Sequence, residues 1–277
     1  MPLITVDALA ARLDDPDLRL CDVRWYLTDP GRGRREYEAA HLPGAVFVDL
    51  EADLTGPTGP GRHPLPSPGR FATRMGELGV GRHHTVVVYD DGGGGVAARL
   101  WWMLRGIGVA SVFVLDGGLS AWRAAALPLT TEVPRPSPVD LPAPPTWPGV
   151  VDRSFVSARL GSFDLIDARA SERYRGEVEP VDPLAGHIPT AVNLPYTENL
   201  DETGRFRAPA ELAARYAGLG AGRPIVAYCG SGVTACHAIL ALELAGVSGV
   251  LLYEGSWSDW SSVEGAPVAV GPDPGTV

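Results

Sequence analysis

Short apolar runs alternate along the chain with longer segments that are rich in apolar residues. The short runs, each typical of a buried strand, lie at residues 18–23, 46–48, 85–89, 111–115 and 224–228. The longer segments, at residues 6–13, 96–106 and 233–244, predict helices. Strands that alternate with helices in this way predict α/β units around a mainly parallel sheet.

The order of these elements occurs twice. Matching residues are Asp22 and Asp167, His41 and His187, and Trp122 and Trp260, at offsets of 145, 146 and 138. Because both halves carry these residues, we expect them to serve the fold. Between the repeats, residues 134–148 hold seven prolines in fifteen positions, which favours an extended connector. We therefore predict a first domain at residues 1–132, a proline-rich linker at 133–149 and a second domain at 150–277.

The candidate chemistry lies where the strand at 224–228 ends and the helix at 233–244 begins. Cys229 stands at that junction, which is where ligands bind in open parallel sheets. The unpaired N–H groups of a helix start favour an anion and lower the pKa of a thiol. Gly230 and Gly232 allow the backbone N–H groups to curl around the sulfur. These features predict a nucleophilic cysteine.

The first half has no thiol at the matching place, which is Asp90. We therefore expect one catalytic domain and one inactive domain. Of the other cysteines, Cys21 is predicted to lie in the core and Cys236 to pack within the helix, while His237 is expected on the helix surface.

Composition narrows the class of protein. The 277 residues carry a formal charge of -10, which argues against nucleic acid and against an anionic membrane as partners. Neither a signal peptide nor a spanning segment is apparent, so we expect a cytoplasmic protein. Three cysteines are too few for a disulfide framework, and no pair of them has metal-ligand spacing. No metal or other cofactor is expected.

The motifs resemble those of a known family. Residues 229–234 (Cys-Gly-Ser-Gly-Val-Thr), 253–260 (Tyr-Glu-Gly-Ser-Trp-Ser-Asp-Trp) and 186–189 (Gly-His-Ile-Pro), in a duplicated unit, resemble the rhodanese sulfurtransferases. The loop is most similar to the 3-mercaptopyruvate branch. The resemblance implies two tandem rhodanese-like α/β domains, and a Cys229 that takes sulfane sulfur from a small donor as a persulfide. It passes that sulfur to cyanide, a thiol or a protein.

The resemblance also implies a set of site residues. The active-site loop comprises Cys229, Gly230, Ser231, Gly232, Val233 and Thr234, and the donor-binding residues are Arg173, His63, Glu51 and Trp25. His63 and Glu51 are expected to form a proton relay with Ser231. Three of these donor-binding residues also have a plainer explanation: His63 as a loop histidine, Arg173 as a solvated charge and Trp25 as a core residue.

The sulfur donor is less well specified by the sequence. Gly230 and Ser231 are neutral, which favours mercaptopyruvate over dianionic thiosulfate. However, the family's second arginine is replaced by Val181, with Arg175 nearby as a partial substitute, so thiosulfate stays open.

Two other classes of function also remain. A persulfide carrier serving a protein partner would have the same loop. A cysteine phosphatase is disfavoured because its Cys-x5-Arg arginine is Ala235 here.

Overall fold

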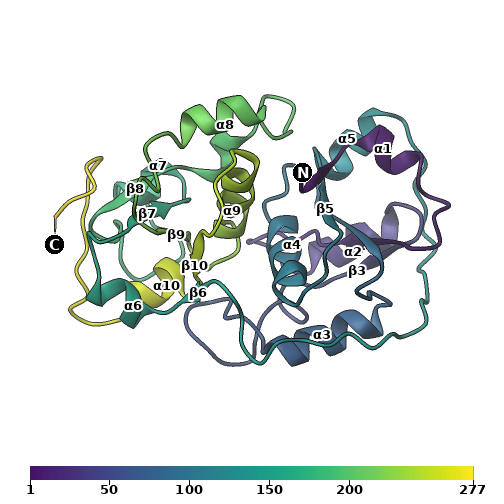
Figure 1. Ribbon diagram of the computed structural model, residues 1–277, viewed down its shortest axis with the longest axis horizontal. Coiled ribbons are helices and arrows are strands. Elements are labelled where there is room, and N and C mark those ends of the chain that lie inside the picture. Colours follow the sequence, from purple (N-terminus) through teal and green to yellow (C-terminus); the bar gives the residue numbers. More distant parts are fainter. Residues whose placement is uncertain (277) are drawn as a thin grey trace. The chain divides into compact units, whose positions relative to one another are not determined.

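The structure is a computed structural model that describes residues 1–276, and the chain forms two compact units (Figure 1). Unit 1 comprises residues 1–56, 66–148 and 202–206, and unit 2 comprises residues 57–65, 149–201 and those from 207 onward. Each unit therefore contains a short segment from the other half of the sequence. The domain limits at 132 and 150 stay a prediction.

Unit 1 is built around a parallel sheet of five strands in the order β1-β5-β4-β2-β3. Its strands are β1 (Leu3–Ile4), β2 (Leu18–Asp22), β3 (Ala45–Phe47), β4 (Thr85–Tyr89) and β5 (Val112–Leu115). Its helices are α1 (Val6–Ala10), α2 (Arg32–Ala39), α3 (Pro68–Glu77), α4 (Ala97–Gly106) and α5 (Gly118–Ala124). Helix α4 packs against β4 and β5, and α5 packs against β5.

Unit 2 repeats this plan, with a parallel sheet in the order β6-β10-β9-β7-β8. Its strands are β6 (Val150–Val151), β7 (Asp164–Asp167), β8 (Ala191–Asn193), β9 (Ile225–Tyr228) and β10 (Leu251–Tyr253). Its helices are α6 (Arg153–Ala158), α7 (Ser171–Tyr174), the 3₁₀ helix η1 (Tyr196–Asn199), α8 (Pro209–Arg215), α9 (Ala235–Leu244) and α10 (Ser256–Trp260). The predicted fold class, two parallel α/β domains, is confirmed.

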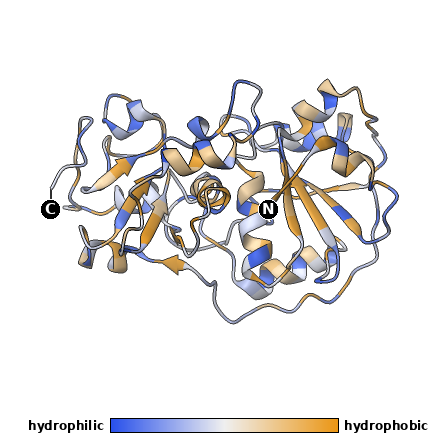
Figure 2. Cartoon of the chain, turned by 45° about the horizontal axis from the view of Figure 1, so that its top comes forward, coloured by the Kyte–Doolittle hydropathy of each residue, from blue (hydrophilic) through white to orange (hydrophobic). Residues whose placement is uncertain are grey.

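Local sequence explains where the elements begin and end. Strand β4 is buried along most of its length, which fits its β-branched sequence Thr-Val-Val-Val-Tyr. Helix α3 begins at Pro68 after Ser67, whose hydroxyl accepts the N–H of Arg70, an N-cap followed by a first-turn proline. Apolar strands at the centre of the sheets contrast with polar loops in Figure 2.

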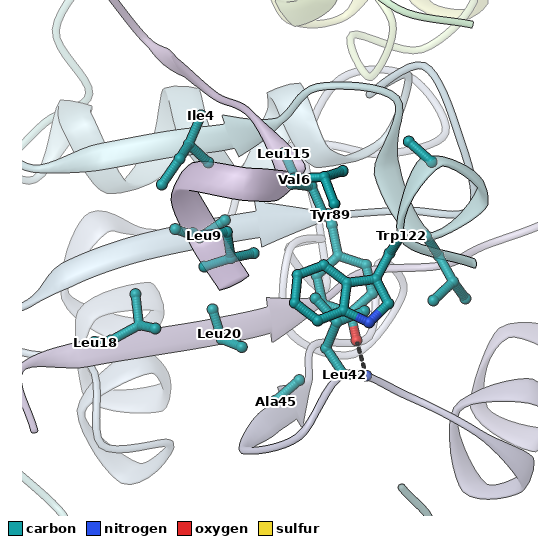
Figure 3. Close-up of a cluster of buried hydrophobic side chains, with 13 residues drawn as sticks. Ile4, Val6, Leu9, Leu18, Leu20, Leu42, Ala45, Tyr89, Leu115 and Trp122 are labelled. Atoms are coloured by element: carbon teal, nitrogen blue, oxygen red, sulfur yellow. Dashed lines mark hydrogen bonds between the residues drawn. The ribbon is translucent and has the colours of Figure 1, made fainter. Parts of the chain in front are cut away.

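The first unit's core joins the sheet to its covering helices. Leu9, Leu20 and Trp122 belong to a cluster of buried side chains that extends over the sheet (Figure 3). Within it, the hydroxyl of Tyr89 accepts the N–H of Leu42 at 3.2 Å, so a polar atom in this apolar cluster is satisfied. No helix among residues 1–276 is both long and apolar enough to cross a membrane.

The repeated histidines serve the fold, as predicted. His41 is fully buried, stacks on Tyr37 and lies 2.7 Å from its carbonyl oxygen through Nδ1. His187 is also fully buried, stacks on Tyr174 and makes the same contact at 2.8 Å. Because both histidines make this contact, it does not distinguish the half that carries Cys229 from the other.

In both units the repeated aspartate, at the carboxyl end of an inner strand, binds an arginine two residues later. Asp22 accepts from Arg24 at 2.7 Å, and Asp167 accepts from Arg169 at 2.6 Å, with all four side chains buried. The repeated tryptophans are also equivalent, since the indole N–H of Trp122 reaches a carbonyl at 2.9 Å and that of Trp260 reaches another at 2.8 Å. These contacts confirm that the residues shared by both halves are structural.

Asp90 occupies the place in unit 1 that Cys229 has in unit 2. Its buried carboxylate accepts the backbone N–H groups of Gly92, Gly94, Val96 and Ala97 at 2.9–3.1 Å. Burial raises the pKa of this carboxyl, and the four N–H donors oppose that rise. The loop after the central strand is therefore a ring of N–H donors around an anion.

We expect Asp90→Ala to lower the stability of the protein by about 3 kcal/mol, because it leaves buried N–H groups without an acceptor. Thermal and urea denaturation of the purified variant measure the loss. Asp91→Ala is the control, because the Asp91 side chain is 42% exposed. Equal midpoints for the two variants would contradict this account of the loop.

Candidate active site

The loop at residues 229–234 follows β9, the central strand of the second sheet, and leads into α9. Helix α9 begins at Ala235, two residues later than predicted, because the chain turns through the loop first. This geometry places Cys229 at the carboxyl end of the strand. The thiol is buried, with the residue 2% exposed.

The start of α10 anchors the backbone of this loop. The N–H of Cys229 donates to the hydroxyl of Ser256 at 3.2 Å. The N–H of Trp257 returns to the carbonyl of Cys229 at 3.0 Å, and that of Ser258 to the carbonyl of Gly230 at 2.9 Å. The segment 253–260, noted in the sequence only as a motif, thus fixes the position of the nucleophile.

The loop after Cys229 also offers backbone N–H groups. Ser231, Val233 and Ala235 follow Cys229 at the spacing at which Gly92, Gly94 and Val96 follow Asp90 in unit 1, although α9 begins one residue sooner after Cys229 than α4 begins after Asp90. The N–H groups of Ser231, Val233 and Ala235 have no hydrogen-bond partner within residues 1–276. They are therefore available to a sulfur anion, which supports the predicted role of the loop.

His63 and Ser231 meet within unit 2, as the resemblance implied. Nδ1 of His63 lies 2.7 Å from the hydroxyl of Ser231, and both side chains are buried. His63 belongs to residues 57–65, which come from the first half of the sequence but form part of unit 2. A proton path between the two side chains is geometrically possible, so His63 is more than a surface loop histidine.

Contacts with residues 254–258 hold this segment in place. The N–H of Arg62 donates to the hydroxyl of Ser258 at 3.1 Å, and that of Leu65 to the Glu254 carboxylate at 3.1 Å. Gly61 has a φ of 72°, and a Cβ there would lie 2.5 Å from the carbonyl oxygen of Gly255. Only glycine fits this close approach.

Arg173 lies beside the loop, but a carboxylate already occupies one of its edges. Its Nε and Nη2 donate to Glu179 at 3.2 and 2.6 Å. Nη2 also reaches Asp182 at 3.1 Å, which leaves Nη1 without a partner within residues 1–276. Arg173 is thus oriented by two acids through Nε and Nη2, and its Nη1 stays available to a ligand.

Arg62 is a functional candidate that sequence reasoning missed. Its Nη1 pairs with Asp182, whereas Nε is buried and has no hydrogen-bond partner within residues 1–276. A Cβ on Gly230 would lie 3.1 Å from Nη2 of Arg62 and 3.5 Å from Nη1 of Arg173. Two guanidinium groups therefore converge on the residue that follows the nucleophile.

The charges of this cluster influence one another. Burial lowers the pKa of Arg62, and the positive charge of Arg173 lowers it further, while the negative charge of Cys229 and Glu179 opposes the fall. The direction means that burial and the charge of Arg173 outweigh the opposing negative charges. An anion bound near Cys229 would favour the Arg62 cation further, in addition to the Asp182 carboxylate with which it already pairs.

The structure separates the predicted residues into two sets. Cys229, the loop residues 230–234, Arg173 and His63 lie in unit 2. Trp25 and Glu51 lie in unit 1, where Trp25 is half-buried and Glu51 is exposed. Their assignment to the donor site stays a proposal.

Two expectations were wrong. Arg175 does not face the loop as a substitute cation, because its Nε and Nη2 pair with the exposed Glu177 at 2.7 and 2.8 Å. His237 is fully buried instead of lying on the helix surface, and it contacts Asn199 and the ring of Tyr196. Helix α9 is buried on almost all sides because η1 and α8 cover it, so its histidine has no solvent face.

Asp17, His83 and His84 form a group whose ligand atoms lie within 4.8 Å of one another in unit 1. His84 does not suit a metal, because its Nδ1 accepts the N–H of Gly81 at 2.9 Å. The neutral ring then carries its proton on Nε2, so neither nitrogen offers a lone pair. This group gives no reason to assign a metal.

Comparison with known proteins identifies the fold and the chemistry. The model of the rhodanese-like domain matches residues 5–125 and again residues 154–263. The chain belongs to the rhodanese family. A Pseudomonas aeruginosa relative named "probable 3-mercaptopyruvate sulfurtransferase" is 48% identical over 97% of this chain and 98% of its own. The chain is accordingly a tandem rhodanese-domain sulfurtransferase, which acts on small sulfur donors and acceptors.

Other rhodanese relatives are similar over comparable lengths. A Mycobacterium tuberculosis relative, "putative thiosulfate sulfurtransferase SseB", is 41% identical over 97% of each chain. The crystal structure of SseA from Escherichia coli, a 3-mercaptopyruvate sulfotransferase by its description, superposes with a TM-score of 0.82 at 38% identity. That match covers 93% of this chain and 99% of SseA. The two names leave two donors to be distinguished.

We expect Cys229 to be the nucleophile of this rhodanese. Burial raises the pKa of the Cys21 thiol to about 12, which keeps it protonated and unreactive near neutral pH. The thiol of Cys236 is buried against the carbonyl of Gly232 at 3.5 Å. Cys229→Ser should therefore lose sulfur transfer by orders of magnitude, whereas Cys21→Ser and Cys236→Ser should keep it.

Mass spectrometry of the intact and digested protein after donor exposure should place one added sulfur on the peptide that contains Cys229. Wild-type turnover by Cys229→Ser would disprove the assignment.

Proposed function

We propose that this rhodanese transfers sulfur from 3-mercaptopyruvate, through a persulfide on Cys229, to a small acceptor such as cyanide or a thiol. One observation carries the choice of donor: Nη2 of Arg62 and Nη1 of Arg173 converge beside Gly230, next to the nucleophile. A guanidinium edge of Nε and Nη2 matches the two oxygens of a carboxylate. On Arg62 this edge has no partner within residues 1–276.

The geometry supports a specific first step. The Cys229 thiolate attacks the thiol sulfur of the donor, a bond forms between the two sulfurs, and the carbon–sulfur bond breaks. The electron pair stays on carbon as the enolate of pyruvate. The new persulfide loses its proton and the enolate gains one, so one proton moves within the site. His63 and Ser231 lie 2.7 Å apart and supply a path for it.

The loop supports the persulfide once it has formed. The N–H groups of Ser231, Val233 and Ala235 have no partner within residues 1–276 and would stabilise the negative terminal sulfur, as loop N–H groups in unit 1 stabilise Asp90. An acceptor anion then attacks that sulfur, the bond between the sulfurs breaks, and the Cys229 thiolate returns. Three free cysteines suit a reducing compartment, and we place the protein in the cytoplasm.

Thiosulfate is the second candidate donor. Two cations beside the nucleophile also attract a dianion, and a relative 41% identical to this chain is named a putative thiosulfate sulfurtransferase. Gly230 and Ser231 add no positive charge of their own, and Arg62 and Arg173 are shared with Asp182 and Glu179. The partial neutralisation favours the donor with a single carboxylate.

Steady-state assays with the two donors test the proposal. We expect a higher kcat/KM for mercaptopyruvate than for thiosulfate. Arg62→Gln and Arg173→Gln should each raise the mercaptopyruvate KM by about 10- to 100-fold, since each removes a charge-assisted hydrogen bond. Arg175→Gln is the control, because Arg175 pairs with Glu177. A higher kcat/KM for thiosulfate would overturn the assignment of mercaptopyruvate as the donor, but it would not contradict a persulfide intermediate on Cys229.

A separate prediction concerns the proton path. His63→Gln and Ser231→Ala should each slow persulfide formation by about 100-fold, the range for a positioned acid or base. Because the two side chains act as one unit, the double variant should be little slower than either single variant. Rapid-mixing single-turnover measurements give the rates. Fully additive losses would show that the two residues act independently.

A further inference from the structure

Asp182 holds the two arginines that face the nucleophile. One carboxylate oxygen pairs with Nη1 of Arg62, and the other accepts from Nη2 of Arg173 at 3.1 Å. Its side chain is only 3% exposed. The opposite nitrogens, Nη2 of Arg62 and Nη1 of Arg173, are those that converge beside Gly230. One carboxylate thus grips both guanidinium groups on the side away from the loop.

The segment around Asp182 is held in place by polar contacts. The Glu179 carboxylate accepts the N–H groups of Val181 and Asp182, each at 3.1 Å, and also binds Arg173. The apolar side chains of Val178, Val181 and Leu184 are exposed. Apolar burial of these side chains therefore does not fix the segment, whereas the two acids do.

We infer that Asp182 is a positioning residue that sets the distance and orientation of Arg62 and Arg173, so that together they take the carboxylate of the donor. The inference rests on the proposed function. In this inference, an acid within a site that binds anions serves to align the two arginines of that site.

Two opposite effects follow from removing this charge. The site becomes more positive, which attracts anions more strongly. At the same time Arg62, which is partly buried near the like charge of Arg173, loses its only carboxylate partner within residues 1–276. A charge that is removed from water without a partner is destabilised. The Arg62 side chain is already 29% exposed, so without Asp182 it is free to turn toward water. Loss of alignment therefore outweighs the gain in charge.

Alkylation of Cys229 measures this alignment without a sulfur donor. Iodoacetate and iodoacetamide react with the same thiol, and only the first carries a carboxylate. We expect Asp182→Asn to lower the ratio of their rate constants by about 10-fold, the effect of one charge-assisted contact. The rate with iodoacetamide reports any change in the thiolate fraction of Cys229, which the ratio cancels because both reagents need the same thiolate. Glu177→Gln is the matched control, because Glu177 lies on the same segment and pairs with Arg175.

A second set of variants separates positioning from a general loss of structure. In an Arg62→Gln background, Asp182→Asn should lower the ratio less than in the wild type, because Arg62 is absent and Arg173 is still held by Glu179. Asp182→Glu keeps the charge and should recover part of the ratio. In donor assays, Asp182→Asn should raise KM and leave kcat nearly unaffected.

The outcomes are distinct from those of the proposed function. An unchanged ratio in Asp182→Asn, or equal loss in both backgrounds, would overturn the inference. A raised ratio would also overturn it, and would show that Asp182 competes with the anion. If mercaptopyruvate fails as a donor while the ratio falls as expected, the donor assignment fails and the aligning role of Asp182 stands.

Discussion

The structure depends on holding an anion at the carboxyl end of a buried central strand. In each unit the chain leaves that strand, curls so that successive N–H groups point inward, and enters a helix. In unit 1 the anion is the carboxylate of Asp90, held by four such groups. In unit 2 the side chain at the same place is Cys229, for which we propose the role of nucleophile. A loop of the same kind, between a central strand and a helix, therefore holds a carboxylate in one half and is proposed to hold a sulfur anion in the other.

A second constraint is that each unit contains a segment from the other half of the sequence. Residues 57–65 bring Arg62 and His63 into unit 2, and residues 202–206 belong to unit 1. There the N–H of Phe206 donates to Asp116 at 2.9 Å, and its ring lies beside Gly94 of the Asp90 loop. The first half of the sequence thus supplies two of the polar side chains near the loop that begins at Cys229.

Sequence reasoning located what depends on local pattern. The strand at Thr85–Tyr89 and the junction at Cys229 followed from apolar runs that end in small polar loops. His63 came from resemblance, and its contact with Ser231 joins residues 168 positions apart. Arg62 was its neighbour in the sequence but carried no signal, because only the folded segment shows that it faces Gly230. His237 failed for a similar reason, since the layer that buries α9 comes from η1 and α8, far away in the sequence.

The charge cluster offers a reason why this chain can carry Val181 where the family resemblance implies a second arginine. Val181 is 37% exposed, and its own contribution is a backbone N–H to Glu179. This bond and the one from the N–H of Asp182 hold the Glu179 carboxylate, which pairs with Arg173. They also hold the backbone of Asp182, whose side chain pairs with Arg62. We propose that Arg62, from residues 57–65, takes the place of the cation that this segment lacks, and Asp182, the residue after Val181, pairs with it. The attraction of the site for anions is therefore set by a few oriented guanidinium groups, although the protein as a whole carries a charge of -10.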